Sequence, residues 1–368
     1  MTFGLAACIA LAATLSCVAS ARAAGEATLV GISLSLTGAD AALGAELRKG
    51  AQACLDAAAP AAGSVHLEVL DDAGRPELAV RNLRRFAANP RVVLVLGGGN
   101  AEVTSALLPV LAEARLPMLG AATGAASTRR VASPHLFHVR AGDADEAAAI
   151  VGQLYELGVQ EFVIVHADTA LGRDGLEGIR FEMARLTMRP AAVVALPAGG
   201  DYGPAIKAVV AAQPPAVVLL AEPEAASRFV QGLSAGGRHM HLIAMSAVAA
   251  DRLALALGEA ARGLAVSQVL PSPWGGKHAV TRAYQAAMRA LGETQFSDAS
   301  MEGCIEARLA REAIKRIKGA VTREAAWAVL DHGSFDLGGY TLRYTPDDRR
   351  GSRYVEMTTI GPRGRLIR

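Results

Sequence analysis

Glycine-rich loops follow several apolar runs of this sequence, and they are where binding chemistry is expected. Gly97-Gly98-Gly99-Asn100 comes directly after the run Val92–Leu96 and opens a helical pattern. Gly120–Gly124 follows the next short apolar run, and Thr123 within it offers a hydroxyl and a backbone N–H. Glycine lets the backbone approach a ligand closely, and asparagine can cap a helix or contact a ligand. These loops therefore predict contacts to a small polar group.

Further polar loops follow other apolar runs in both halves of the chain. In the first half, Leu36–Gly44 contains two glycines and one acid. In the second half, Asp168–Gly175 carries several polar groups, and Glu222 follows the run Ala216–Ala221. A carboxylate at such a point either caps a helix or pairs with a cation, and both alternatives stay open.

Motifs of known catalytic chemistry are absent from the sequence. It contains no Gly-x-Ser-x-Gly, no Gly-x4-Gly-Lys-Ser/Thr, no His-Glu-x-x-His and no Cys-x-x-Cys. The loop at 97–99 is not a dinucleotide fingerprint, because Glu102 stands where a third glycine is needed and the loop belongs to the third strand–helix unit. The sequence thus predicts a protein that is not an enzyme and that has no cofactor and no metal site.

Short Val/Leu/Ile runs alternate with longer helical patterns along the chain, which predicts parallel sheets in two α/β lobes. The expected strands are Thr28–Leu36, Val65–Leu70, Val92–Leu96, Phe162–His166, Ala192–Leu196, Ala216–Ala221, Leu242–Met245 and Leu264–Val269. The expected helices are Gly44–Ala59, Pro76–Ala88, Ala101–Ala114, Gly172–Leu186, Tyr202–Ala212, Glu224–Ser234, His278–Leu291, Ser300–Lys318 and Arg323–Leu330.

Composition agrees with this pattern and excludes other classes of protein. The 368 residues carry 37 Lys+Arg against 35 Asp+Glu, so no basic excess indicates a nucleic-acid partner. Hydrophobic residues make up 52% but aromatic residues only 4%, which favours sheets covered by helices on both faces and packed with Ala, Val and Leu.

Residues 1–23 have the pattern of a cleaved secretory signal peptide. Leu5–Val18 is apolar, and Ala21-Arg22-Ala23 is a small-x-small cleavage site. A short membrane anchor and lipidation at Cys17 are the alternatives. Two cysteines remain in the mature chain, Cys54 and Cys304, and we expect them to be buried, unpaired thiols.

The order and spacing of these motifs resemble the type I periplasmic substrate-binding proteins of ABC transporters, in particular the leucine/isoleucine/valine-binding branch, from Val30 to the end of the chain. The motifs that carry the resemblance are Thr37-Gly38 through Gly44, Asp71-Asp72 with Pro76, the glycines at 97–99, Leu116–Met118 with Ala121–Thr123, and Leu171–Gly175.

The resemblance implies two Rossmann-like lobes with mainly parallel sheets, joined by three crossovers. The crossovers are expected near His138–Ala141, Val266–Leu270 and Leu342–Thr345. Lobe I is then expected over 28–140 plus 269–344, and lobe II over 141–268 plus 345–368.

The resemblance also implies contacts to an amino-acid ligand. The loops at Asn100 and Thr123 would bind its carboxylate, and the carbonyl of Ala121 its ammonium group. Leu43 and Leu171 stand where related proteins have pocket tyrosines, so they imply an apolar wall, although both could simply be core.

The second-lobe acid that pairs with the ammonium group in that branch falls near Ser246 or Ala247, neither of which is acidic. A buried ammonium group without a counter-charge is costly. Two alternatives remain: Glu222 supplies the charge, or the ligand has no ammonium group and is a carboxylic acid or a neutral molecule.

The function implied is that of a monomeric periplasmic receptor. It would bind a small solute, an amino acid or a related carboxylate or amide, and deliver it to ABC permease subunits in the inner membrane. A periplasmic ligand sensor that regulates a signalling partner and a soluble α/β enzyme are the alternatives.

Overall fold

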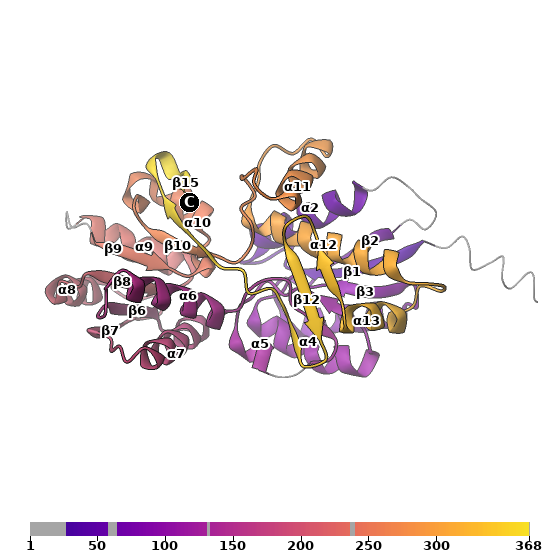
Figure 1. Ribbon diagram of the computed structural model, residues 1–368, viewed down its shortest axis with the longest axis horizontal. Coiled ribbons are helices and arrows are strands. Elements are labelled where there is room, and N and C mark those ends of the chain that lie inside the picture. The colour runs from indigo at the N-terminus through magenta and orange to yellow at the C-terminus, as the bar shows by residue number, and fades with distance from the viewer. Residues whose placement is uncertain (1–26, 58–64, 131–132, 236–239, 368) are drawn as a thin grey trace, which may run out of the picture.

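The chain folds into two α/β lobes that lie side by side (Figure 1). The computed structural model describes residues 27–57, 65–130, 133–235 and 240–367. The signal peptide predicted for residues 1–23, with Cys17, lies outside the described residues.

The first lobe contains a parallel five-stranded sheet in the order β2-β1-β3-β4-β5. The central strand β3 is buried along its whole length, as expected for a strand covered on both faces. Helices α2 and α12 pack on one face, and α3 and α4 on the other. The bounds are β1 (Thr28–Leu34), β2 (Val65–Asp71), β3 (Val92–Leu96), β4 (Met118–Leu119), β5 (Leu136–Phe137), α2 (Ala41–Asp56), α3 (Pro76–Ala88), α4 (Ala101–Ala114) and α12 (Asp298–Arg316).

The second lobe contains a seven-stranded sheet in the order β15-β14-β10-β9-β8-β6-β7. Its pairs are parallel except β10–β14 and β14–β15, which are antiparallel. Helices α6 and α7 cover one face, and α8, α9 and α10 the other. The bounds are β6 (Val163–Ala167), β7 (Ala192–Leu196), β8 (Ala216–Leu220), β9 (His241–Ala244), β10 (Ala265–Gln268), β14 (Glu356–Ile360), β15 (Leu366–Ile367), α6 (Asp143–Glu156), α7 (Ala170–Arg185), α8 (Gly203–Ala212), α9 (Pro223–Ala235) and α10 (Ala250–Leu257).

A small antiparallel sheet, in the order β11-β12-β13, and several short elements complete the fold. None of the described helices is both long and apolar enough to cross a membrane. The remaining elements are α5 (Ala126–Arg130), α11 (Ala279–Ala290), α13 (Arg323–Asp331), β11 (Ser334–Asp336), β12 (Thr341–Thr345), β13 (Asp348–Gly351), η1 (Ser246–Val248), η2 (Gly258–Ala261) and η3 (Pro362–Gly364).

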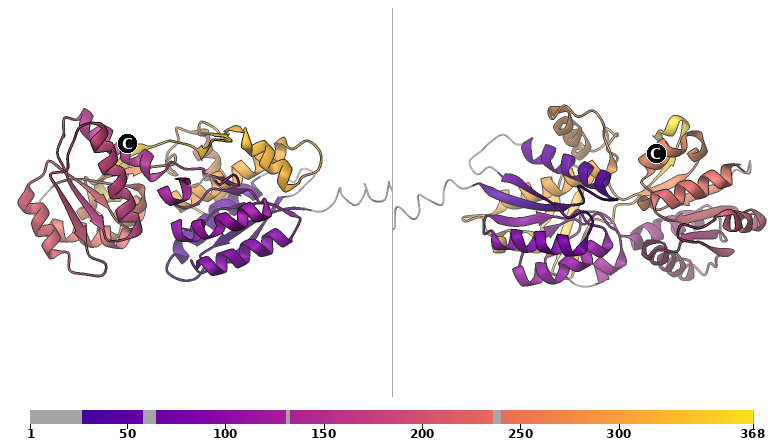
Figure 2. Two further views of the ribbon diagram at one scale, coloured as in Figure 1. Left: turned by 90° about the horizontal axis from the view of Figure 1, so that it is seen from below. Right: turned by 180° about the vertical axis from the view of Figure 1, so that it is seen from behind.

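The chain passes between the two large sheets three times: after β5, after β10, and between β13 and β14. Figure 2 shows these narrow connections from two further sides. The third passage, at residues 352–355, comes later than the expected Leu342–Thr345. The reason is that Leu342 and Tyr344 of β12 are buried in the first-lobe core, and β13 still pairs with β12.

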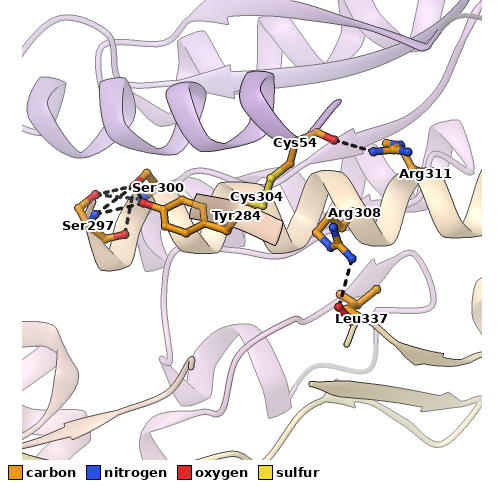
Figure 3. Close-up of a disulfide and its surroundings, with 8 residues drawn as sticks. All are labelled: Cys54, Tyr284, Ser297, Ser300, Cys304, Arg308, Arg311 and Leu337. Carbon is orange, nitrogen blue, oxygen red and sulfur yellow. Dashed lines mark hydrogen bonds between the residues drawn. A yellow bond between two sulfur atoms is a disulfide. The ribbon is translucent and has the colours of Figure 1, made fainter. Parts of the chain in front are cut away.

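Cys54 and Cys304 form a disulfide, so the prediction of two unpaired thiols is wrong. Their Cα atoms are 5.1 Å apart although 250 residues separate them in sequence. Helices α2 and α12 approach closely because they meet at glycines: a Cβ atom on Gly50 would lie 1.7 Å from the carbonyl oxygen of Ser300. Figure 3 shows the disulfide between the two helices. The sequence cannot reveal this pairing, since it depends on how distant helices pack.

Candidate functional site

A cavity of about 390 Å³ lies between the two lobes. Residues from α2, the loop after β4 and the start of α12 form its first-lobe wall, and residues 246–252 form its second-lobe wall. Segments that connect the lobes complete it. The lining residues are Ala42, Leu43, Glu46, Ala122, Gln295, Phe296, Ser297, Asp298, Ala299 and Glu302 in the first-lobe wall, Ser246, Ala247, Ala249, Asp251 and Arg252 in the second-lobe wall, and Arg140, Gln268, Val269 and Leu270 in the connecting segments.

The first-lobe wall is ordered by hydrogen bonds around the start of α12. The Ser297 hydroxyl caps the helix by accepting from the Ser300 N–H at 3.1 Å, and it lies 2.8 Å from Glu46 on α2, to which it donates. The Tyr284 hydroxyl lies 2.6 Å from the Ser300 hydroxyl, and Figure 3 shows these side chains together. N-cap bonds of this kind fix where a helix begins. They therefore fix the helix that carries Glu302.

The second-lobe wall is held by one buried carboxylate. Glu146 on α6 is 1% exposed and accepts from both the N–H and the hydroxyl of Ser246, at 2.7 and 2.8 Å. It also accepts from the Ser267 hydroxyl on β10. Glu146 thus fixes η1 against the helix and the strand that lie beside it.

Arg140 lies on the first connecting segment and contacts both walls. Its Nη2 donates to the Ser246 hydroxyl at 2.8 Å, and its Nη1 lies 3.3 Å from Oε2 of Glu302. Burial lowers the pKa of Arg140, but the carboxylates of Glu302, Glu146 and Asp143 outweigh this effect, so its pKa lies above the ordinary value. The guanidinium group therefore stays charged and ties one lobe to the other.

Glu302 is the buried partner of Arg140 in the first lobe. Burial raises the pKa of Glu302, and the positive charges of Arg140 and Arg129 offset this only in part. The Oε1 atom of Glu302 has no hydrogen-bond partner within the described part of the chain. The pKa values of both partners are raised, for different reasons. Three acids stabilise the charged form of Arg140, whereas Glu302 accepts a hydrogen bond at only one oxygen.

Two of the residues proposed from the sequence line the cavity. Leu43 lies in the first-lobe wall and Ser246 in the second-lobe wall, where Ala247 also lines the cavity. Ala122 lines it as well, between the expected residues Ala121 and Thr123.

The other proposed first-lobe residues have local partners in this structure. The Asn100 side chain caps α4 by accepting from the Val103 N–H at 3.1 Å, and it borders a small hollow that Leu43 shares. The carbonyl of Ala121 accepts from the Thr123 N–H at 2.6 Å. The Thr123 hydroxyl oxygen accepts from the Ala125 N–H at 3.1 Å. Local hydrogen bonds therefore hold these turns in shape.

Leu171 and Glu222 do not line the cavity. Leu171 is half-buried in the first turn of α7, and Glu222 is half-buried just after β8. Both follow strands that run parallel to β9, so they lie at the same edge of the sheet as Ser246.

Sequence reasoning missed Arg140, Gln268 and Glu302. Glu302 and Glu306 stand four residues apart in an otherwise apolar stretch of α12, and both are buried. Acids are seldom fully buried unless they are paired or functional. This spacing is the one sign in the sequence that could have drawn attention to Glu302.

Two α/β lobes joined by three chain segments, with a cavity between them, define a two-lobed ligand-binding protein. The chain belongs to the periplasmic binding protein family, whose model matches residues 29–365. No curated protein matches its sequence.

Several solved structures share the fold over nearly their whole length. A substrate-binding periplasmic protein from Ralstonia solanacearum is 30% identical, with a TM-score of 0.80 over 92% of this chain and 99% of that one. A possible leucine/isoleucine/valine-binding protein from Rhodopirellula baltica SH 1 is 26% identical, with a TM-score of 0.80 over 94% and 97%. An ABC transporter substrate-binding protein from Sphaerobacter thermophilus is 24% identical, with a TM-score of 0.80 over 91% and 94%.

Proposed function

We propose that this chain is the periplasmic solute receptor of an ABC importer. It binds a small amino acid, or a related carboxylate or amide, between two lobes that close on it. The observation that carries the proposal is the cavity of about 390 Å³, which is lined from both lobes and from the segments that connect them. Its volume falls in the range of small-molecule sites.

The proposed ligand contacts combine apolar and polar groups. Leu43 and Phe296 supply apolar surface, and Ser246 and Gln268 supply hydrogen bonds. Related structures include a possible leucine/isoleucine/valine-binding protein, which supports a solute of the amino-acid class.

Lobe closure would bring further groups to the ligand. The turns at Asn100 and Thr123 follow parallel strands of the first-lobe sheet, at the edge where Ala122 lines the cavity. Leu171 and Glu222 occupy the matching edge of the second-lobe sheet. We keep these four residues and Ala121 as proposed contacts that form on closure, when exclusion of water strengthens each hydrogen bond.

In this proposal the protein changes no bond in its solute. It is exported by the signal peptide at residues 1–23, works as a monomer, and hands the solute to permease subunits in the inner membrane. It has no cofactor and no nucleic-acid partner.

Thermal-shift screening of the mature protein tests the proposal. The probes are the twenty amino acids, small carboxylates and small amides. A probe present at about 100 times its Kd is expected to stabilise the protein by roughly 2.7 kcal/mol. Mass spectrometry should recover the bound probe unchanged.

A cavity-filling variant supplies the control for the screen. Ala247 is half-buried and lines the cavity, whereas Ala184 is exposed on α7. Ala247→Phe should abolish the shift and Ala184→Phe should preserve it. The absence of any shift across the panel, or conversion of a bound probe into a product, would overturn the proposal.

A further inference from the structure

Glu302 lines the cavity and has one carboxylate oxygen without a hydrogen-bond partner within the described residues. Its side chain is 6% exposed, its Oε2 lies 3.3 Å from Arg140, and its Oε1 is buried with no hydrogen-bond partner within the described part of the chain. A buried polar atom without a partner destabilises the fold, so such an atom at a binding cavity indicates that a ligand completes it.

The other carboxylates of the cavity are already engaged. Glu46 accepts from Lys49 at 2.9 Å and from the Ser297 hydroxyl at 2.8 Å. Asp251 accepts from the Arg252 N–H at 2.8 Å, and Asp298 also has an interaction partner. Among the acids that line the cavity, Glu302 is therefore the one with a buried oxygen still open to a donor.

Arg140, the partner of Glu302, has a hydrogen-bond donor without an acceptor among the described residues. Its Nε is buried and without a hydrogen-bond partner within the described part of the chain, while Nη1 and Nη2 contact Glu302 and Ser246. The pair thus offers an unused donor on the cation and an unused acceptor on the anion. A molecule that carries a carboxylate and an ammonium group matches both.

The charge of the cavity also favours a cationic group. Four carboxylates and two guanidinium groups line it, so the lining is acidic. Burial raises the pKa of Glu302, which means that the existing positive charges do not fully compensate the carboxylate. An additional cation next to Glu302 would restore that balance.

We propose that Glu302 accepts a hydrogen bond from the ammonium group of a zwitterionic solute, whose carboxylate lies beside Arg140. This proposal rests on the proposed receptor function. It places the ammonium site on α12 in the first lobe. Glu302 thereby replaces Glu222, which does not line the cavity, as the partner of the ammonium group.

The first arm of the test uses the unmodified mature protein and isothermal titration calorimetry. Each of the twenty amino acids is titrated, and the tightest binder is compared with its 2-hydroxy acid, in which a hydroxyl group replaces the ammonium group. We expect the hydroxy acid to bind at least roughly a hundredfold more weakly, because the charged acceptor loses its partner. Equal affinity of the two compounds would overturn the proposal.

The second arm compares two variants with the same chemical change. Glu302→Gln should weaken binding of the amino acid by roughly tenfold or more and should affect the hydroxy acid much less. Glu312→Gln, on the same helix but outside the cavity lining, is the matched control and should leave both affinities unchanged. Circular dichroism checks that each variant folds, and if Glu302→Gln does not fold the first arm decides alone. Unchanged affinity of Glu302→Gln for the amino acid, or an equal loss in Glu312→Gln, would refute the assignment.

The panel separates failure of this inference from failure of the receptor function. If a small carboxylate or amide binds and no amino acid does, the receptor function stands and the role of Glu302 is wrong. If no probe binds, both proposals are overturned.

Discussion

The two walls of the cavity are stabilised in different ways. The first-lobe wall rests on two long helices, α2 and α12, which are joined by the disulfide Cys54–Cys304 and meet at glycine contacts. The second-lobe wall rests on the three-residue element η1 and the short helix α10. Between these, Ala249 adopts a left-handed conformation with φ 52°. Glu146 holds this second wall through hydrogen bonds to Ser246.

The difference suggests a division of labour between the lobes. Covalent and close backbone contacts make the first-lobe wall a fixed platform that carries Glu302. The second-lobe wall instead depends on hydrogen bonds to a single buried carboxylate, Glu146. Arg140 contacts both walls and so links them directly.

Removal of the disulfide should have the largest effect. We expect the double variant Cys54→Ala/Cys304→Ala to lose about 4 kcal/mol of unfolding free energy, because a native cross-link restricts the unfolded chain. Urea unfolding measures this loss. Hydrogen exchange should show weaker protection in α2 and α12 and unchanged protection in β6 and β8.

Reduction of the unmodified protein provides the control for this prediction. A reducing agent should lower the stability of the unmodified protein towards that of the double variant and leave the variant itself unaffected. Loss of protection spread equally over both lobes would contradict the idea of a locally fixed first-lobe wall.

Addition of a single methyl group should also have opposite effects on stability in the two lobes. A Cβ atom on Gly303 would lie 2.1 Å from the carbonyl oxygen of Leu47, so Gly303→Ala should force α2 and α12 apart and lower the unfolding free energy by about 3 kcal/mol. Gly152 on α6 has nothing within 4 Å of such a Cβ atom. Gly152→Ala should raise stability by about 0.5–1 kcal/mol, because alanine favours helix. Denaturant unfolding of both variants checks the opposite signs, and equal effects would show that the helix contact is not tight.

The start of α6, the helix that carries Glu146, should respond to pH through Asp143. Burial, and next the charge of Glu146, raise the pKa of Asp143 from 3.8 to about 7, although Arg140 and Arg129 oppose the shift. Between these values the folded protein binds a proton that the unfolded chain releases, so this contribution to stability is present below pH 3.8 and is lost as pH rises towards 7.

Unfolding measured at several pH values in this window tests the prediction. The stability of the unmodified protein relative to Asp143→Asn should fall as pH rises. Asp348 is a suitable control, because its hydrogen bond to Arg350 lowers its pKa to about 2. Stability relative to Asp348→Asn should therefore stay constant from about pH 5 upwards. A rise with pH in the Asp143 comparison would show that this carboxyl group is paired and charged.

Much of the fold could be predicted from the sequence, because the residues that mark where a helix begins lie next to that helix in the sequence. The bounds of β3, β7, α3 and α4 agree with those predicted, and Pro76 and Asn100 mark the starts of the two helices. By contrast, α2 begins at Ala41, directly after its N-cap residue Asp40 and ahead of the predicted Gly44. Helix α6 was missed, although Ala147, Ile150, Val151 and Leu154 follow the i, i+3, i+4, i+7 spacing of a buried helix face.

Less of the site could be predicted, because its groups meet only through packing. Leu43 and Ser246, which line the cavity, were proposed from the resemblance to the leucine/isoleucine/valine-binding branch, whose pocket residues fall at their positions. Arg140 and Glu302 are 162 residues apart and belong to no motif. The same reason hid the disulfide, whose two helices come from opposite ends of the chain.

A crystal structure of the mature protein with its tightest-binding amino acid would test the central claim most directly. The account predicts that the amino acid lies between α12 and residues 246–252, with its nitrogen within hydrogen-bond distance of Glu302 Oε1. An amino acid found outside this cavity, or inside it with its nitrogen directed at Glu222, would contradict the account.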